Sequence, residues 1–150
     1  MPIRCEIVSQ DRMVWEGEAD IVILPGTEGE MGVLPNHAPL LSTLNIGILT
    51  VRSRDKEEHF TIAGGMVEIQ PEIITVMADA AENVEEIDIS RAEAARRRAE
   101  EYLKLGPPPD MDNYLAMESA LKRSTLRLEA ARRFRKLPSQ YYGGDQGEGK

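Results

Sequence analysis

The side chains able to act as nucleophiles or bases are few and scattered along the chain. His37 and His59 are the only histidines, and Cys5 is the only cysteine. A histidine acts as a general base only beside a suitable partner, and Asp20 or Asp79 could in principle pair with one of them. No serine elbow, paired metal ligands or CxxC motif accompanies these residues. The pattern disfavours enzyme chemistry, and a lone histidine between prolines is more typical of packing or of an interface.

A glycine-rich segment, residues 24–41, is the second place where the sequence could encode chemistry. Its glycines are spaced three apart, which permits a tight and irregular backbone. A phosphate-binding loop would need a Lys-Ser/Thr pair and a helix after the last glycine, but Pro35 and Pro39 would break a helix there. The segment is also one glycine short of a dinucleotide-binding fingerprint. We therefore expect a corner of a sheet whose side chains meet a partner.

Two strongly helical runs, Ile89 to Leu105 and Met111 to Leu137, follow and predict a helical hairpin. In the first run, Ser90 and Glu93 have the spacing of a capping box, which places the start of the helix at Ser90. Gly106 suits the left-handed residue after a helix, and the three prolines that follow it lack amide hydrogens. The turn of the hairpin is therefore well defined.

The second helix should begin at Asp110 as its cap and end before Pro138. Small and apolar residues recur along both helices and predict the faces that meet: Ala92, Ala95, Ala99 and Tyr102 on the first, and Tyr114, Met117, Leu121, Leu128 and Ala131 on the second. At ~25 cal/mol per Å² of apolar surface, an alanine seam contributes roughly a few kcal/mol, comparable with the entropy of ordering a few residues. We infer a conditionally closed hairpin, although a permanently docked one fits these features equally well.

The chain from Ile3 to Val76 shows the alternation of short strands, with breaks at glycine, proline and charged turns. The expected fold class is α+β and mostly β: an N-terminal antiparallel β-sandwich or barrel followed by a C-terminal antiparallel two-helix hairpin. The expected domains are a β-sandwich over residues 1–86, a helical hairpin over residues 87–138 and a disordered tail over residues 139–150.

Composition indicates a folded, soluble chain whose charge is unevenly divided. Residues 1–88 carry 5 basic and 17 acidic side chains, whereas residues 89–150 carry 13 basic and 9 acidic ones. No apolar run approaches the ~20 residues of a membrane-spanning helix, no signal peptide opens the chain, and a single cysteine suggests a reducing compartment. An acidic body should attract the basic hairpin, and so should any other acidic surface.

The residues from Gly26 to Leu41, together with residues 63–69 and 76–81, closely resemble the epsilon subunit of the rotary ATP synthase over residues 1–137. The resemblance implies a non-catalytic subunit whose sandwich contacts the gamma subunit and the membrane rotor ring, with Glu30 and His37 facing those partners. It also implies a hairpin that can extend toward the acidic catalytic beta subunits and suppress ATP hydrolysis. Five arginines would be available for that contact: Arg96, Arg97, Arg132, Arg133 and Arg135.

Some bacterial members of that family bind ATP between the two helices, through a motif of Ile or Leu, Asp, two variable residues, Arg and Ala. Residues 87–92 of this chain satisfy the motif. The resemblance implies an ATP site in which arginine pairs clamp the triphosphate, carboxylates meet the nucleoside, and a small residue leaves room for the base. The arginines would be Arg91, Arg98, Arg123 and Arg127. The carboxylates would be Glu82 and Asp88, and the small residue would be Ala92. Alternatively, Asp88 merely precedes a cap and the arginines are solvated surface.

We thus expect a coupling and inhibitory subunit that needs no cofactor and takes ATP as a regulatory ligand. It would reach the membrane only through its complex, at the cytoplasmic face of the bacterial plasma membrane. One alternative is mainly an ATP-sensing module with weak or no inhibition. Another is nucleic-acid binding by the basic hairpin, which the acidic body and the lack of interleaved aromatic residues disfavour.

Overall fold

The first part of the chain forms β-strands, in which buried and exposed side chains alternate. The structure is a computed structural model that describes residues 1–106 and 110–135. Within those residues, the strands form one eight-stranded sheet. Their bounds are β1 Ile3–Val8, β2 Met13–Ala19, β3 Ile21–Gly26, β4 Gly29–Val33, β5 Leu40–Ser53, β6 Lys56–Ile69, β7 Ile73–Ala78 and β8 Ala81–Asn83.

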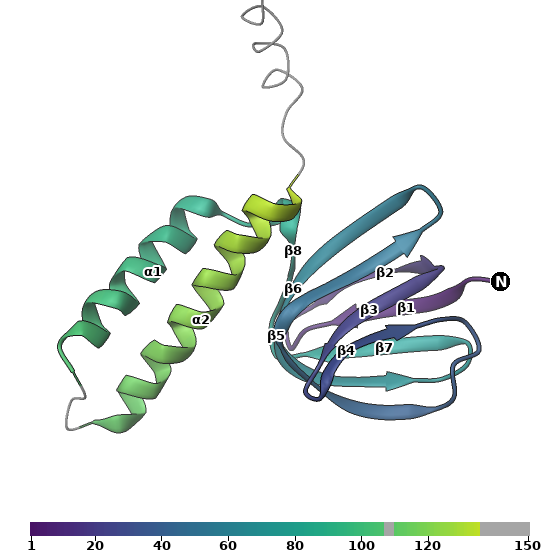
Figure 1. Ribbon diagram of the computed structural model, residues 1–150, viewed down its shortest axis with the longest axis horizontal. Coiled ribbons are helices and arrows are strands. Elements are labelled where there is room, and N and C mark those ends of the chain that lie inside the picture. Colours follow the sequence, from purple (N-terminus) through teal and green to yellow (C-terminus); the bar gives the residue numbers. More distant parts are fainter. Residues whose placement is uncertain (107–109, 136–150) are drawn as a thin grey trace, which may run out of the picture.

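The sheet has the order β2-β1-β7-β6-β5-β3-β4, and β8 pairs with β6. It curls around a common core, as Figure 1 shows, and the largest fully buried side chains include Phe60, Ile3, Ile7, Leu24 and Leu49. Neighbouring strands run antiparallel except β1 and β7, which are parallel with Arg4 opposite Ile73. The expected α+β fold with an N-terminal β-sandwich is confirmed.

Strand β6 is longer than the sequence indicated. A break was expected at Gly64-Gly65, yet β6 continues through both glycines, and its register with β5 is the same on either side. The glycines have φ of 96° and 131°, values that other residues rarely adopt. A Cβ atom at Gly65 would lie 2.3 Å from the carbonyl oxygen of Met77. The glycines therefore allow close strand contact instead of ending the strand.

A short 3₁₀-helix, η1 (Val84–Glu86), leads into α1 (Ile89–Lys104). The expected cap at Ser90 is wrong, because Asp88 is the N-cap and its Oδ1 accepts the N–H of Arg91 at 3.0 Å. The helix begins two residues earlier than expected, because the Asp88 carboxylate already accepts a first-turn amide and aspartate is as favourable an N-cap as serine. Gly106 has φ of 81°, which confirms its expected left-handed conformation after the helix.

The second helix, α2, spans Met111–Phe134 and begins at the expected cap. Asp110 Oδ1 accepts the N–H groups of Asp112 and Asn113 at 3.1 and 3.4 Å. The helix was expected to reach Leu137, but Arg135 is already extended. Residues 136–150, which include the expected tail, and the prolines at 107–109 lie outside the described residues.

The expected seam between the helices holds Ala92, Ala99 and Ala131, all buried. It also holds Ser124, whose exposed fraction is 2% and which the sequence stripe omitted. The Ser124 hydroxyl donates to the carbonyl of Ala120 at 2.8 Å, so it enters the seam without an unpaired polar group. Small side chains therefore let the helices approach closely.

The hairpin lies against the sandwich through α2, which Figure 1 shows between α1 and the sheet. A small apolar cluster makes this contact: Val84, Ile87, Ala130 and Ala131, with Ile48 and Phe134 at its border. It is separate from the core of the sandwich. The hairpin is thus closed here, and it is held by few apolar side chains.

Candidate functional site

An open cavity of about 580 Å³ lies where α1, α2 and the segment after β8 meet. Five residues that the sequence assigned to an ATP site line it: Glu82, Asp88, Arg91, Arg98 and Arg127. Arg91 and Arg98 come from α1, and Arg127 comes from α2. The cavity therefore has walls from three segments, and it exists in this form only while the hairpin is closed.

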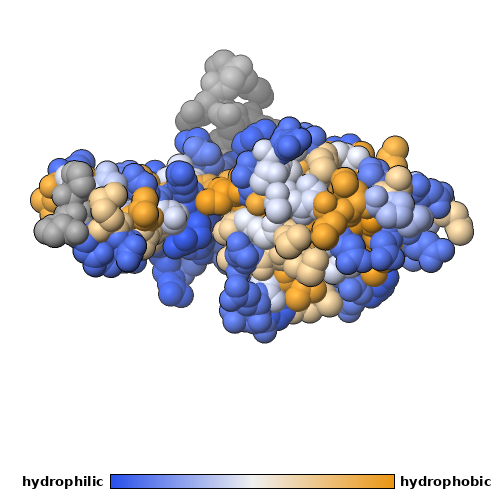
Figure 2. Space-filling view, turned by 90° about the horizontal axis from the view of Figure 1, so that it is seen from below, coloured by the Kyte–Doolittle hydropathy of each residue, from blue (hydrophilic) through white to orange (hydrophobic). Residues whose placement is uncertain are grey.

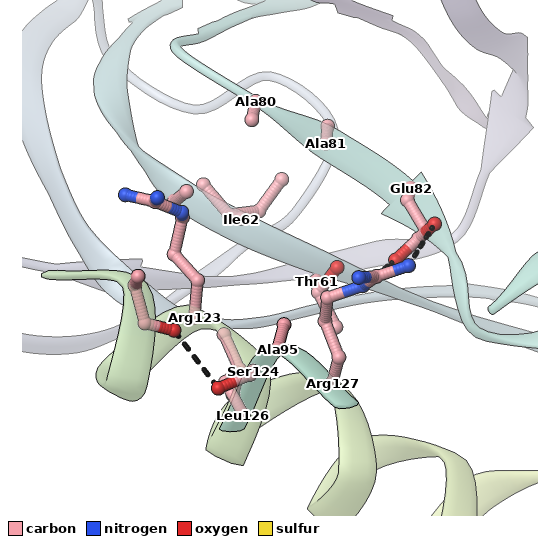
Figure 3. Close-up of a pocket in the computed structure, with 12 residues that line it drawn as sticks. Thr61, Ile62, Ala80, Ala81, Glu82, Ala95, Arg123, Ser124, Leu126 and Arg127 are labelled. Atoms are coloured by element: carbon pink, nitrogen blue, oxygen red, sulfur yellow. Dashed lines mark hydrogen bonds and ion pairs between the residues drawn. The ribbon is translucent and has the colours of Figure 1, made fainter. Parts of the chain in front are cut away.

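A second cavity of about 390 Å³ adjoins the first, because Glu82, Ala95 and Arg127 line both. Arg123 lines this second cavity and not the first, so the expected arginine pair of α2 is divided between the two spaces. Figure 3 shows Arg123 and Arg127 extending from α2 on either side of Ala95, toward β6 and β8. The remaining wall is mainly apolar, with Ile62, Ala80, Ala81 and Leu126.

Glu82 and Arg127 form the strongest polar contact of the site. Arg127 Nε lies 2.6 Å from Glu82 Oε1, and Arg127 Nη2 lies 3.2 Å from Oε2. Both side chains are about a quarter exposed, at 26% for Glu82 and 29% for Arg127. An anion that uses Arg127 must therefore share it with Glu82 or displace that carboxylate.

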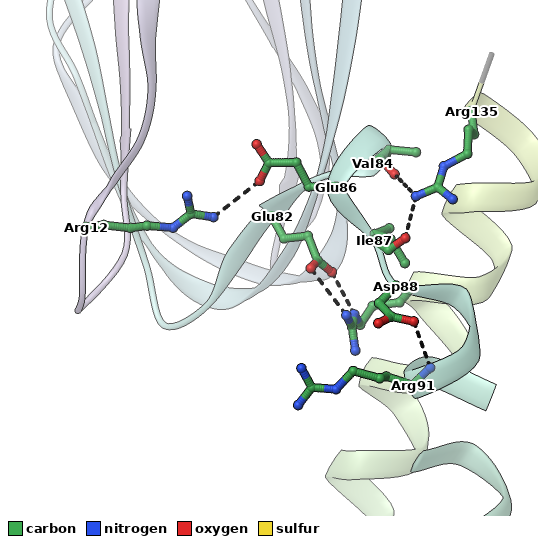
Figure 4. Close-up of polar contacts among 9 residues, drawn as sticks. Arg12, Glu82, Val84, Glu86, Ile87, Asp88, Arg91 and Arg135 are labelled. Atoms are coloured by element: carbon green, nitrogen blue, oxygen red, sulfur yellow. Dashed lines mark hydrogen bonds and ion pairs between the residues drawn. The ribbon is translucent and has the colours of Figure 1, made fainter. Parts of the chain in front are cut away.

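Asp88 also has a structural role besides its place in the cavity. As the N-cap of α1 it gives one oxygen to the Arg91 amide, while the Arg91 guanidinium points away from it (Figure 4). One side chain thus orients the start of the helix and borders the space between the arginines. The sequence placed Asp88 either in the ATP site or just before a cap; it is itself the cap, and this role is compatible with its place in the cavity.

Ala92 does not line either cavity. Its exposed fraction is 0%, and it is packed in the seam between the helices. Ala95, one turn further along α1, instead lines both cavities and offers the open wall that the sequence interpretation gave to Ala92. The signal for Ala95 was its place in the same alanine stripe, three residues after Ala92.

A second polar contact fastens the end of α2 to the segment before α1. Arg135 Nη2 donates to the carbonyl oxygens of Val84 at 3.0 Å and Ile87 at 2.5 Å, as Figure 4 shows. Nearby, Arg12 of the turn after β1 reaches Glu86 at 3.4 Å. The Arg135 contact was not predictable from the sequence, because its acceptors are backbone carbonyls about fifty residues earlier.

The other residues assigned to partner contact lie on the sandwich. Glu30, on β4, is exposed and lines a surface hollow with Met31, Leu40, Leu41 and Met66. Figure 2 shows apolar side chains gathered on this side of the molecule, and Leu40, Leu41 and Met66 are 42%, 59% and 40% exposed. This surface has the composition of a contact area.

His37 follows β4 and is half-buried. Its Nδ1 lies 2.7 Å from the carbonyl oxygen of Ala38, so the ring donates to its neighbour. Asp20, one of the two carboxylates considered as a partner, instead accepts the N–H of Arg54 at 2.6 Å. In the described part of the chain, no helix is long and apolar enough to cross a membrane, and no group of His, Cys, Asp or Glu could hold a metal.

The fold defines a β-sandwich protein with an appended helical hairpin, and a cavity lined by arginines and carboxylates lies where the two parts meet. Comparison with known families gives the particular family. The model of the ATP synthase delta/epsilon chain β-sandwich domain matches residues 2–84, and that of the long α-helix domain matches residues 85–132. The chain therefore belongs to the delta/epsilon chain family of the ATP synthase. Its members are non-catalytic subunits, which confirms that this chain is not itself an enzyme.

Relatives support the assignment over nearly the whole chain. The ATP synthase epsilon chain of Moorella thermoacetica is 44% identical over 86% of this chain and 96% of its own length. That of Dehalococcoides mccartyi is 41% identical over 91% and 96%. A chain in the cryo-EM structure of Euglena gracilis mitochondrial ATP synthase, comprising OSCP, F1 and c-ring, superposes with a TM-score of 0.71 at 27% identity, over 87% of this chain and 81% of that one.

The fold also recurs in a central stalk and c-ring structure of Tetrahymena thermophila mitochondrial ATP synthase. The TM-score is 0.58 at 12% identity, over 87% of this chain and 97% of that chain. Both the sandwich and the helices are therefore shared with solved members of ATP synthase assemblies.

Proposed function

We propose that this chain is the central-stalk epsilon subunit that couples the gamma subunit to the rotor ring in a proton-translocating bacterial ATP synthase. The proposal rests on the family and on the assemblies that contain its structural neighbours. The exposed surface around Glu30, Leu40 and Leu41 is the part of the sandwich that we assign to those partners, together with His37. The subunit would be peripheral at the cytoplasmic face of the membrane.

We further propose that the hairpin is a movable brake on ATP hydrolysis. Its contact with the sandwich has few apolar side chains, so its release costs little burial. In the closed form, two arginines that could bind an acidic partner already have partners within the chain. Arg135 donates to backbone carbonyls, and Arg127 pairs with Glu82. Release would free these arginines for the catalytic beta subunits, where electrostatic complementarity would guide the extended hairpin.

The brake is tested with a catalytic subcomplex that lacks this subunit. Adding the full chain should lower the ATPase rate, and a chain truncated after Ile87 should bind without lowering it. A binding assay on the same samples separates loss of inhibition from loss of assembly. An unchanged rate with the full chain bound would show that the hairpin does not inhibit.

The proposal that ATP is the regulatory ligand rests on one observation. Arg91, Arg98 and Arg127 line the same cavity, which only the closed hairpin forms. A ligand bound solely to this state stabilises it by RT ln(1 + L/Kd), where L is the free ligand concentration. ATP would therefore keep the hairpin closed and the brake off. Arginines suit the role because their planar guanidinium groups bind phosphate oxygens at two points.

Calorimetry on the isolated chain tests this ligand. ATP should release heat with the native chain, and Arg91→Ala should abolish most of it. Arg97→Ala is the matched control, because Arg97 is exposed on the same helix and does not line either cavity. Absence of heat at millimolar ATP, or equal loss in both variants, would rule out the arginine site.

The alternative is that the chain mainly senses ATP and inhibits weakly or not at all. The three arginines of the cavity support ATP binding, and they do not require that the hairpin inhibit ATP hydrolysis. The two assays separate the candidates. Heat of binding without any effect of truncation on the ATPase rate would support the sensor alone.

A further inference from the structure

The last residue of α2 makes an aromatic contact that neither the coupling surface nor the ATP site uses. The ring of Phe134 stacks on the imidazole of His59 in β6, with centroids 4.0 Å apart and an angle of 21° between the planes. The His59 side chain is only 13% exposed. The contact joins the end of the hairpin to the sandwich at a residue that can change its charge near neutral pH.

The hydrogen bonds of His59 define its neutral form. Nε2 lies 3.3 Å from Glu57 Oε1, and Nδ1 lies 3.0 Å from Thr50 Oγ1. Because an ionised carboxylate can only accept, Nε2 carries the hydrogen and Nδ1 accepts from the Thr50 hydroxyl. A second proton would go to Nδ1, and the hydroxyl of Thr50, a residue that is 9% exposed, would have to turn its hydrogen aside and accept instead.

Charged side chains surround His59 on each of the elements that pack against it. Glu57 of β6 attracts a proton to the ring, but its other oxygen is 3.2 Å from Arg52 Nε of β5. Arg133 of α2 holds its guanidinium 4.8 Å from the centroid of the same Phe134 ring. Lys56, Glu58 and Glu85 line the adjoining hollow.

The balance of these effects favours the neutral ring in the closed hairpin. Burial lowers the pKa of His59 from its ordinary value of 6.5, Glu57 opposes the shift, and Arg133 and Arg52 reinforce it. Arg133 lies on α2, as does the Phe134 ring that covers the imidazole. Opening the hairpin removes both, so the cost of protonating His59 depends on whether the hairpin is closed.

We propose that the stack of Phe134 on His59 is a proton-sensitive latch, which holds the hairpin on the sandwich while His59 is neutral and weakens when His59 is protonated. The latch rests on the proposed function in one respect, namely that the hairpin moves. Because the pKa is lower in the closed form than in the open form, the latch is fully effective above the open-form pKa. Its contribution is lost as pH falls through the closed-form pKa.

The first test follows the ring protons of His59 by NMR during a pH titration of the full chain. Phe134→Leu removes the aromatic ring but keeps an apolar side chain at the end of α2. The pKa of His59 should rise toward its ordinary value in this variant, and the signals of His37 serve as an internal reference. An unchanged His59 titration would overturn the latch, whether or not the hairpin moves.

The second test measures exchange protection of α2 amides, corrected for intrinsic rates, at about pH 7.5 and about pH 5.5. Protection should fall several-fold at the lower pH in the native chain, and much less in His59→Gln, which cannot take up the proton. His37→Gln is the matched control and should behave as the native chain. Fluorescence of Trp15, which packs near Phe60 in the sandwich core, verifies that each variant is folded.

The outcomes separate the latch from the proposed brake. An equal fall in native chain and His59→Gln would assign the pH effect to other groups and refute the latch while leaving the brake intact. Protection of α2 that matches the sheet at both pH values would refute hairpin movement, and the latch with it.

Discussion

Arg127 and Glu82 are 45 positions apart in the chain, yet their side chains form a two-point ion pair with N to O distances of 2.6 and 3.2 Å. The pair joins α2 to β8 and borders both cavities at the junction of hairpin and sandwich. The arginine that we propose as a phosphate ligand therefore also joins the hairpin to the sandwich. In our proposal, ligand binding and hairpin closure share this side chain.

Replacing Arg127 should weaken closure of the hairpin even without ligand. Arg127→Ala removes both charged hydrogen bonds, and for partly exposed groups we expect a loss of about 1 kcal/mol in the free energy of hairpin opening. Hydrogen exchange of α2 amides gives that free energy directly. Lys122→Ala, exposed on the same helix, is the control; an equal change in both variants would mean that the ion pair does not contribute.

The cap of α1 gives a test of the corrected helix start. Asp88→Ala should destabilise α1 by about 1 kcal/mol, because the Arg91 amide loses its acceptor. Ser90→Ala should have little effect, since Ser90 is already inside the helix. Thermal unfolding followed by circular dichroism compares the two, and a larger loss for Ser90→Ala would restore the capping box expected from the sequence.

Asp88→Asn separates the two roles of that residue. Asparagine keeps the capping oxygen but removes the negative charge, so helix stability should stay near that of the native chain. A change in the heat of ATP binding in this variant would then report on the ligand site alone. If helix content falls as far as in Asp88→Ala, the charge itself is what stabilises α1.

Arg135 should fasten the end of α2 through backbone carbonyls. Arg135→Ala leaves the oxygens of Val84 and Ile87 without this charged donor, and we expect the free energy of hairpin opening to fall by roughly 1–3 kcal/mol. Arg132→Ala is the control, because Arg132 is exposed about one turn earlier. Exchange protection in residues 128–134 measures both; no difference between them would contradict the role of Arg135.

Cys5 gives a prediction for alkaline pH. Burial raises the pKa of its thiol from 9.0 to about 12, with a smaller contribution from Glu6. The unfolded chain therefore ionises first, and the thiol contributes stability that is full below pH 9.0 and is lost as pH rises toward about 12. At pH 8, a thiol reagent should label the native chain far more slowly than the denatured chain; equal rates would show that the thiol is accessible.

Sequence periodicity predicted the fold well because its signals were local. Asp110 and Gly106 mark the ends of helices by the chemistry of one residue, and both were confirmed. The cap at Ser90 was wrong because Asp88, two residues earlier, is an equally favoured capping residue and accepts the Arg91 amide instead. Strand β8 (Ala81–Asn83) lies beyond the range in which strands were expected, because it is short and all three of its residues are only partly buried.

The candidate site was predictable where a motif existed. The motif placed Asp88 and Arg91 together, and the helical spacing added Arg98, all of which line one cavity. The division of Arg123 from Arg127 could not be foreseen, because it depends on how α2 rotates against the sheet. The contacts of Arg135 and Phe134 involve partners far away in the chain, for which one sequence carries no signal.

The measurement that tests the account most directly is exchange protection of the α1 and α2 amides in the full chain, with and without saturating ATP. Without ATP, the helices should exchange well before the sheet, and ATP should raise their protection while leaving the sheet unchanged. Helices as well protected as the sheet in both conditions would contradict a hairpin that opens, and with it the regulatory function proposed for this chain.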